Sequence, residues 1–270
     1  IFTNSKIDTK FQVSFMRESF LMKTLHHPAI VNFYGMNFNS FEHRDHFEPT
    51  LLMEYMSNDS LDKILDQETK GIAPHDWTDV KKYICLLGIS HAMNYLHQKK
   101  IIHRDLKPGN VLMDDYLYPH VSDFGLSRCF REEESIELSK TAFVGTPKYM
   151  APELLQNKKD YSSSVDVYAF GVMAYEIVTG SEPFTKNGEK LTLEKILKNA
   201  VYNSEVPEYP ENVSIQMRCL INSCLNQNSC ERPPFDFIYS QLSSPELNFL
   251  NVHESDKQEI INYIELLQQE

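Results

Sequence analysis

The spacing of hydrophobic positions divides the chain into a mixed first part and a mostly helical remainder. In residues 11–25 the apolar positions recur at largely helical spacing, and Pro28 follows shortly after. Two apolar runs come next, residues 30–33 and 51–53, which predict two strands joined by a loop over the polar stretch 37–50. This order predicts a small lobe built from one helix and two strands.

The rest of the chain has the pattern of a helical lobe. Residues 78–98 carry an apolar stripe that suits a long helix facing a core. Residues 111–113 and 120–122 predict short strands around a turn. Residues 164–179 are apolar nearly all round and end at Gly180, as a buried helix with a glycine C-cap does.

A last amphipathic stripe, formed by Ile260, Ile264 and Leu267, is expected to pack back on the body of the protein. Together these segments predict an α+β fold of two lobes, with the joint between them at residues 53–57.

Composition narrows the class of protein. The 270 residues are 41% hydrophobic and 24% charged, which is typical of a globular protein with one large or two small cores. No apolar run reaches the roughly 18 residues that indicate a transmembrane helix, and no signal-peptide pattern opens the sequence. The five cysteines lack C-x-x-C spacing, which favours reduced thiols and a cytoplasmic location. The net charge of −12, without a basic stretch, argues against nucleic-acid binding.

Two clusters at fixed spacing carry the candidate chemistry: His-Arg-Asp-Leu-Lys-Pro-Gly-Asn at residues 103–110, and Asp-Phe-Gly starting thirteen residues after Asn110. Asp105 can orient an attacking hydroxyl and accept its proton, while Lys107 can reach a phosphate. Asn110 and Asp123 supply the hard oxygen ligands that magnesium prefers. Phosphoryl transfer needs these parts, because positioning and charge neutralisation dominate its catalysis.

With these motifs the chain resembles a eukaryotic-type protein kinase, whose H-R-D-x-K-x-x-N, D-F-G and A-P-E series appears here in order and ends at Ala151-Pro152-Glu153. The resemblance covers about residues 1–240. It implies a partial small lobe over residues 1–56, a helical large lobe over 57–245 and a C-terminal helical tail over 246–270. It also implies ATP and Mg²⁺ as cofactors.

Carried over residue by residue, the resemblance assigns the catalytic roles. Asp105 corresponds to the base, Lys107 to the phosphate-contacting lysine, Asn110 and Asp123 to the magnesium ligands, and Glu18 to the glutamate of the small-lobe helix. For the nucleotide, Met53 corresponds to the gatekeeper, Glu54 to Met56 to the adenine-binding hinge, Ser60 to the ribose contact and Leu112 to the floor of the adenine site.

The resemblance also implies a supporting framework. Four residues correspond to the hydrophobic stack that aligns active kinases: Met22, Phe33, His103 and Phe124. Glu153 and Arg232 correspond to a buried ion pair, and Asp166 to the anchor of the loop at 103–110.

Substrate and regulation follow from further matches. Lys107, and Thr146 within Gly-Thr-x-x-Tyr, imply protein substrates phosphorylated on serine or threonine, and Asp-Val-Tyr-x-Phe-Gly at 166–171 is similar to the tyrosine-kinase-like group. Arg104 implies control by an upstream kinase or by autophosphorylation, with Ser135, Ser139 and Thr141 as candidate sites.

The sequence leaves two points open, the level of activity and the choice between a catalytic and a non-catalytic function. Nothing before Glu18 resembles the Gly-rich loop and strand lysine with which such kinases bind ATP, so we expect weak ATP binding and weak or no activity from residues 1–270 alone. The alternative function is a non-catalytic, kinase-like scaffold that binds partners through its large lobe. The presence of Asp105, Asn110 and Asp123 argues for catalysis. A second His-Arg-Asp at residues 43–45 lacks the following lysine and asparagine and is interpreted as coincidence.

Overall fold

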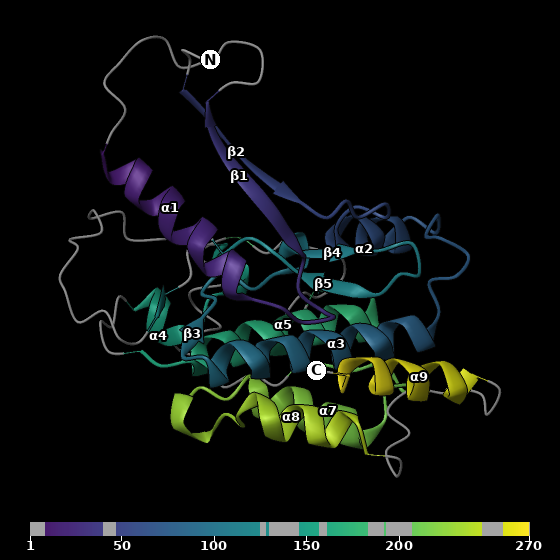
Figure 1. The fold of residues 1–270 in the computed structure, drawn as a ribbon. Coiled ribbons are helices and arrows are strands. Elements are labelled where there is room, and N and C mark those ends of the chain that lie inside the picture. The colour runs from purple at the N-terminus through teal and green to yellow at the C-terminus, as the bar shows by residue number, and fades with distance from the viewer. Residues whose placement is uncertain are drawn as a thin grey trace.

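A small lobe of one helix and a two-stranded sheet stands above a larger, mainly helical lobe in the computed structural model (Figure 1). This is the two-lobed α+β arrangement that the sequence predicts. The structure describes residues 9–39, 47–124, 128–129, 146–156, 161–182, 192, 207–244 and 256–269.

The small lobe consists of α1 (Thr9–Thr24) and an antiparallel pair, β1 (Phe33–Asn39) and β2 (Phe47–Met53). The helix forms where the apolar spacing predicts it and buries Met22 against the core. Large apolar side chains of the sheet lie at its surface: Tyr34 is 64% exposed and Leu52 is 61% exposed.

The predicted strand over residues 30–33 is wrong in its position. Ile30 instead forms a parallel bridge with Val121, where the Val121 N–H donates to Ala29 O at 2.9 Å and the Val31 N–H donates to Val121 O at 3.1 Å. Ile30 and Val31 are buried, and β1 begins only at the last residue of the run, Phe33. The polar stretch 37–50, predicted as a loop, contributes to both strands, because an antiparallel pair tolerates polar residues on a solvated face.

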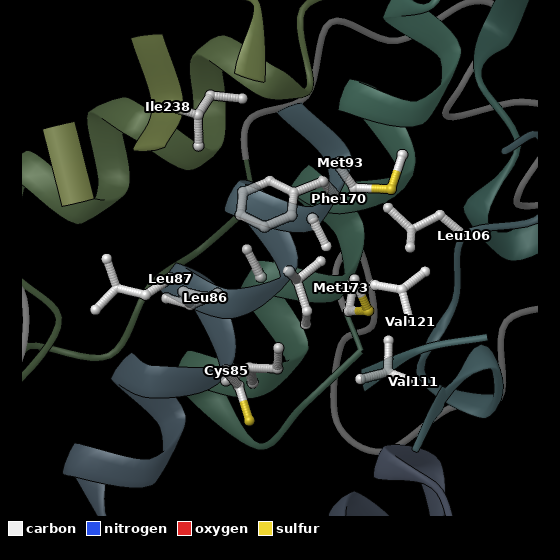
Figure 2. Close-up of a cluster of buried hydrophobic side chains, with 14 of the residues drawn as sticks. Cys85, Leu86, Leu87, Met93, Leu106, Val111, Val121, Phe170, Met173 and Ile238 are labelled. Atoms are coloured by element: carbon white, nitrogen blue, oxygen red, sulfur yellow. The ribbon is translucent and has the colours of Figure 1, made fainter. Parts of the chain in front are cut away.

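The large lobe is built around α3 (Asp79–Gln98) and α5 (Ser164–Thr179). Every residue of α5 from Val165 to Val178 is buried, and Gly180 ends the helix with φ 65°, as predicted. Figure 2 shows the packing: Met93 of α3, Phe170 and Met173 of α5 and Ile238 of α8 (Phe235–Leu242) surround one core.

Short elements complete the described part of this lobe. The hairpin of β4 (Val111–Met113) and β5 (Pro119–Val121) confirms the two predicted strands to within a residue. The others are α2 (Leu61–Thr69), β3 (Ile101–Ile102), η1 (Pro108–Asn110), β6 (Arg128–Cys129), η2 (Pro147–Tyr149), α4 (Pro152–Leu155), α7 (Ile215–Cys224), η3 (Ser229–Glu231) and α8 (Phe235–Leu242).

The C-terminal stripe forms α9 (Lys257–Leu267), which packs back on the body of the protein as predicted and lies along α3 (Figure 1). Tyr263 and Leu267 are buried there. The contact requires glycine at position 88, since a Cβ at Gly88 would lie 2.2 Å from Tyr263 Oη. Among the described helices, none combines the length and apolar character needed to cross a membrane.

Candidate active site

The loop that follows β3 is held by one buried carboxylate. Asp166 of α5 is fully buried and accepts the His103 N–H at 2.9 Å and the Arg104 N–H at 2.8 Å. His97 Nε2 lies 2.8 Å from the same carboxylate. Arg104 has φ 72°, a conformation that a non-glycine residue adopts only when its surroundings enforce it. Asp166 therefore fixes the backbone immediately before Asp105, which is the anchoring role predicted for it.

Asp105 is the centre of the site. Its Oδ2 accepts a hydrogen bond from Lys107 Nζ at 2.7 Å and another from Asn110 Nδ2 at 3.1 Å. Its Oδ1 accepts the Thr146 N–H at 3.3 Å, and Lys107 Nζ also donates to Thr146 Oγ1 at 3.2 Å. The structure thus brings Asp105, Lys107 and Asn110 together, and it adds the hydroxyl-bearing Thr146 from a separate segment.

The β4–β5 hairpin sets Asn110 and Asp123 at one edge. Asn110 ends η1 just before β4, and its backbone oxygen accepts both the N–H and the hydroxyl of Ser122, at 2.8 and 3.0 Å. Asp123 follows directly, with an exposed side chain and φ 60°. Because Asn110 Nδ2 also donates to Asp105 O at 2.7 Å, the amide oxygen is the atom that is left for a cation. An amide oxygen and a carboxylate at one edge suit a hard divalent metal.

Three of the four predicted stack residues belong to the same hydrophobic cluster: Met22 and Phe124 are buried in it, and Phe33 packs against it. The fourth, His103, has its ring centroid 5.4 Å from that of Phe124, and its Nε2 lies 3.1 Å from Ser122 O. Small-lobe and large-lobe residues therefore share one core next to Asp123.

The predicted hinge runs out of β2 alongside the start of β1. The Glu54 N–H donates to Asn32 O at 2.9 Å, and Asn32 Nδ2 donates to Glu54 Oε2 at 2.7 Å. Met53 is 37% exposed, whereas Met56 is buried.

The two predicted nucleotide residues of the large lobe lie together. Ser60 forms a bridge with Leu112 of β4, which places the predicted ribose contact beside the predicted floor. Ser60 is buried, and its hydroxyl donates to Asp59 Oδ1 at 3.3 Å and to Asp62 Oδ1.

Several predicted residues lie outside what the structure describes. Glu18 is in α1, but its side chain is not among those described. The candidate phosphorylation sites and the second His-Arg-Asp also lie outside the described residues; these are Ser135, Ser139, Thr141 and residues 43–45.

Sequence reasoning missed an ionic cluster beside Thr146. Lys148 pairs with Glu176 and, at 2.8 Å, with Glu182, while Tyr149 Oη donates to Glu176 Oε2 at 2.8 Å. Burial raises the pKa of the Glu176 carboxyl, and Lys148 opposes that rise. Lys148 and Glu176 are far apart in the sequence, so no local spacing marks them.

The segment that contains Glu153 is tied to the large lobe by a buried ion pair. Arg232 Nη1 and Nη2 donate to Glu153 Oε1 and Oε2 at 2.7 and 2.9 Å, and Arg232 Nε donates to Asn226 O at 2.7 Å. This two-point contact confirms the predicted pairing.

Comparison with known proteins decides the family. Residues 1–242 match the protein kinase domain family. The chain belongs to the protein kinase family. This kinase domain is 34% identical over 243 residues to cysteine-rich receptor-like protein kinase 27 of Arabidopsis thaliana, a match that covers 85% of the chain and 36% of the relative.

Two further relatives are named as serine/threonine kinases. The kinase domain is 33% identical to the probable serine/threonine-protein kinase drkC of Dictyostelium discoideum, over 88% of the chain and 30% of the relative. It is also 33% identical to serine/threonine-protein kinase CTR1 of Arabidopsis thaliana, over 84% of the chain and 26% of the relative. The matched part is thus about a third or less of these two proteins' length.

Proposed function

We propose that this protein kinase transfers the γ-phosphate of ATP to serine or threonine hydroxyls of proteins. The observation that carries the proposal is the contact of Asp105 with Lys107 and Thr146. A carboxylate, an ammonium group and a threonine hydroxyl within hydrogen-bonding distance form a site where an incoming hydroxyl can be oriented and a phosphate neutralised. The relatives' names support serine/threonine specificity.

In the proposed mechanism Asp105 accepts the proton of the attacking hydroxyl and holds its oxygen in line with the phosphate. Lys107 offsets negative charge on the phosphoryl group during transfer. Asn110 and Asp123 would hold Mg²⁺, which supplies charge neutralisation to the phosphates. Asn110 also donates to Asp105, so it couples the orientation of the base to the metal site.

For the nucleotide we propose that the strip from Met53 to Met56 binds the adenine, with Leu112 beneath it and Ser60 near the ribose. The bridge between Ser60 and Leu112 supports this arrangement. Glu18 is proposed to orient a phosphate-binding lysine.

We further propose the domain limits 1–56, 57–245 and 246–270. The exposed apolar side chains of β1 and β2, among them Tyr34 and Leu52, support the interpretation of residues 1–56 as part of a larger small lobe. The free thiols of Cys85, Cys219, Cys224 and Cys230 support a cytoplasmic location for the domain.

Titration calorimetry with ATP, in magnesium and in EDTA, tests the site. We expect magnesium to strengthen ATP binding in the wild type and to have little effect on Asp123→Asn. Asp76→Asn, which alters an exposed residue of the large lobe, is the matched control and should behave as the wild type. ATP binding that is indifferent to magnesium in the wild type would favour the non-catalytic scaffold.

A further inference from the structure

The segment that carries Thr146 continues into η2, which lies beside the proposed acceptor site. Thr146 touches both Asp105 and Lys107, and Lys148 follows two residues later. A protein substrate that presents its hydroxyl to Asp105 must therefore pass close to Lys148.

Lys148 is surrounded by negative charge. Its ammonium group pairs with Glu176 of α5 and with Glu182 just beyond that helix, and it lies 5.2 Å from the centre of the Tyr149 ring. Asp62 of α2 also acts electrostatically on Tyr149, as do Glu176 and Glu182. Lys148 is 20% exposed and Glu182 is 44% exposed, so the edge of this ionic cluster is open to solvent.

We propose that Lys148 determines substrate specificity: by occupying the carboxylates of Glu176 and Glu182, it makes the kinase select acceptor peptides that lack arginine or lysine at the position beside the cluster. This inference rests on the protein kinase function proposed above. It assigns to one residue the charge preference of the peptide site.

Competition between two cations supplies the physical reason. Two carboxylates beside a peptide site attract a basic side chain, since charge-assisted hydrogen bonds are the strong ones. Lys148 already pairs with both carboxylates from within the chain, so a substrate cation must displace it and gains little. Without Lys148 the carboxylate of Glu176 loses its cation and can attract a basic side chain of the substrate.

The test compares Lys148→Met with the wild type on a set of serine peptides in which one arginine is moved through each position around the serine. Binding of the fluorescently labelled peptides is measured by anisotropy, and phosphate transfer is measured in parallel. At one position, Lys148→Met should bind the arginine peptide about tenfold more tightly than the alanine peptide. The wild type should bind the two peptides with nearly equal affinity.

The variant should also show a pH signature. Once Lys148 is removed, the pKa of the buried Glu176 carboxyl rises further, and a protonated Glu176 cannot attract arginine. The arginine preference of Lys148→Met should therefore grow as the pH is raised. A merely structural effect of the substitution predicts no such trend.

Two controls complete the design. Lys148→Arg keeps the cation and should keep the wild-type preference. Lys81→Met removes a lysine whose partner is Glu259 of α9 and should also leave the preference unchanged. If Lys148→Met melts cooperatively, and is therefore folded, an arginine preference equal to that of the wild type overturns the proposal. Phosphate transfer that Asp105→Asn does not reduce counts against the proposed function instead, and peptide binding still decides the role of Lys148.

Discussion

Asp166 Oδ1 accepts the Arg104 N–H at 2.8 Å, and Arg104 has φ 72°. The same carboxylate receives the His103 N–H at 2.9 Å. A fully buried acceptor thus determines a backbone conformation that costs free energy by itself. The position of Asp105 depends on this contact, because it is the next residue in the chain.

Asp166→Asn should destabilise the protein. An asparagine offers one acceptor oxygen in place of two, so a buried N–H loses its partner, which costs about 1–3 kcal/mol. Urea unfolding measures the change. Asp236→Asn alters an exposed aspartate at the start of α8 and should stay within about 0.5 kcal/mol of the wild type. Equal stability of both variants would show that Asp166 does not hold the loop.

Arg232→Ala should be more damaging, because it leaves the Glu153 carboxylate buried without its cation. Loss of one partner of a buried pair costs about 3–5 kcal/mol. Lys70 and Asp66, 2.6 Å apart, form the matched exposed pair. Lys70→Ala should lower the free energy of unfolding by less than about 1 kcal/mol. Thermal and urea unfolding of the two variants check the contrast, and a small effect of Arg232→Ala would contradict it.

Gly88→Ala should weaken the packing of α9 on α3. The new Cβ would lie 2.2 Å from Tyr263 Oη and 2.6 Å from Pro119 Cγ, so the helix must shift. Overpacking of this kind costs about 1–3 kcal/mol. Hydrogen exchange should show faster exchange in α9 and little change in α5. Gly35→Ala, where a Cβ would meet nothing within 4 Å, is the control and should leave α9 protected.

Acid should destabilise the protein through His27. Burial, followed by the nearby His91 and His120, lowers the His27 pKa to about 3. Both ring nitrogens are engaged, because Nδ1 accepts the Ala29 N–H at 2.9 Å and Nε2 lies 2.7 Å from His91 Nδ1. Below about pH 6.5 the His27 ring takes up a proton in the unfolded chain, whereas in the folded protein it stays neutral down to about pH 3. The free energy of unfolding therefore falls as the pH drops from about 6.5 towards 3.

Urea unfolding at several pH values measures this dependence. One such histidine contributes a slope approaching about 1.4 kcal/mol per pH unit. His27→Gln should flatten the slope by that amount, whereas the exposed His75→Gln should leave it unchanged. An unchanged slope in His27→Gln would refute the assignment.

Strong local signals made parts of the fold predictable from the sequence. The run of apolar residues that stops at Gly180 predicted where α5 lies. Its end was predictable because a glycine with positive φ commonly ends a helix. Residues 111–113 likewise form β4 as predicted. The roles of Asp105, Lys107 and Asn110 came from spacing and resemblance, and their contacts are consistent with those roles.

Other features depend on distant partners and could not be predicted in this way. The run at Ile30 has the composition of a strand, yet its position is decided by Val121, far along the chain. Lys148 and Glu176 meet only because η2 packs on α5, which no pattern in either segment indicates. Long-range pairs of this kind become visible only in the folded structure.

The decisive measurement is phosphate transfer by Asp105→Asn, because Asp105 is the proposed base. The wild type and the variant are incubated with Mg²⁺, γ-labelled ATP and a protein substrate that contains serine and threonine, and the labelled amino acids are identified after hydrolysis. We expect weak, magnesium-dependent formation of phosphoserine or phosphothreonine with the wild type, and a loss of at least about 100-fold with Asp105→Asn at unchanged ATP affinity. Equal transfer by the wild type and Asp105→Asn would contradict the proposed role of Asp105.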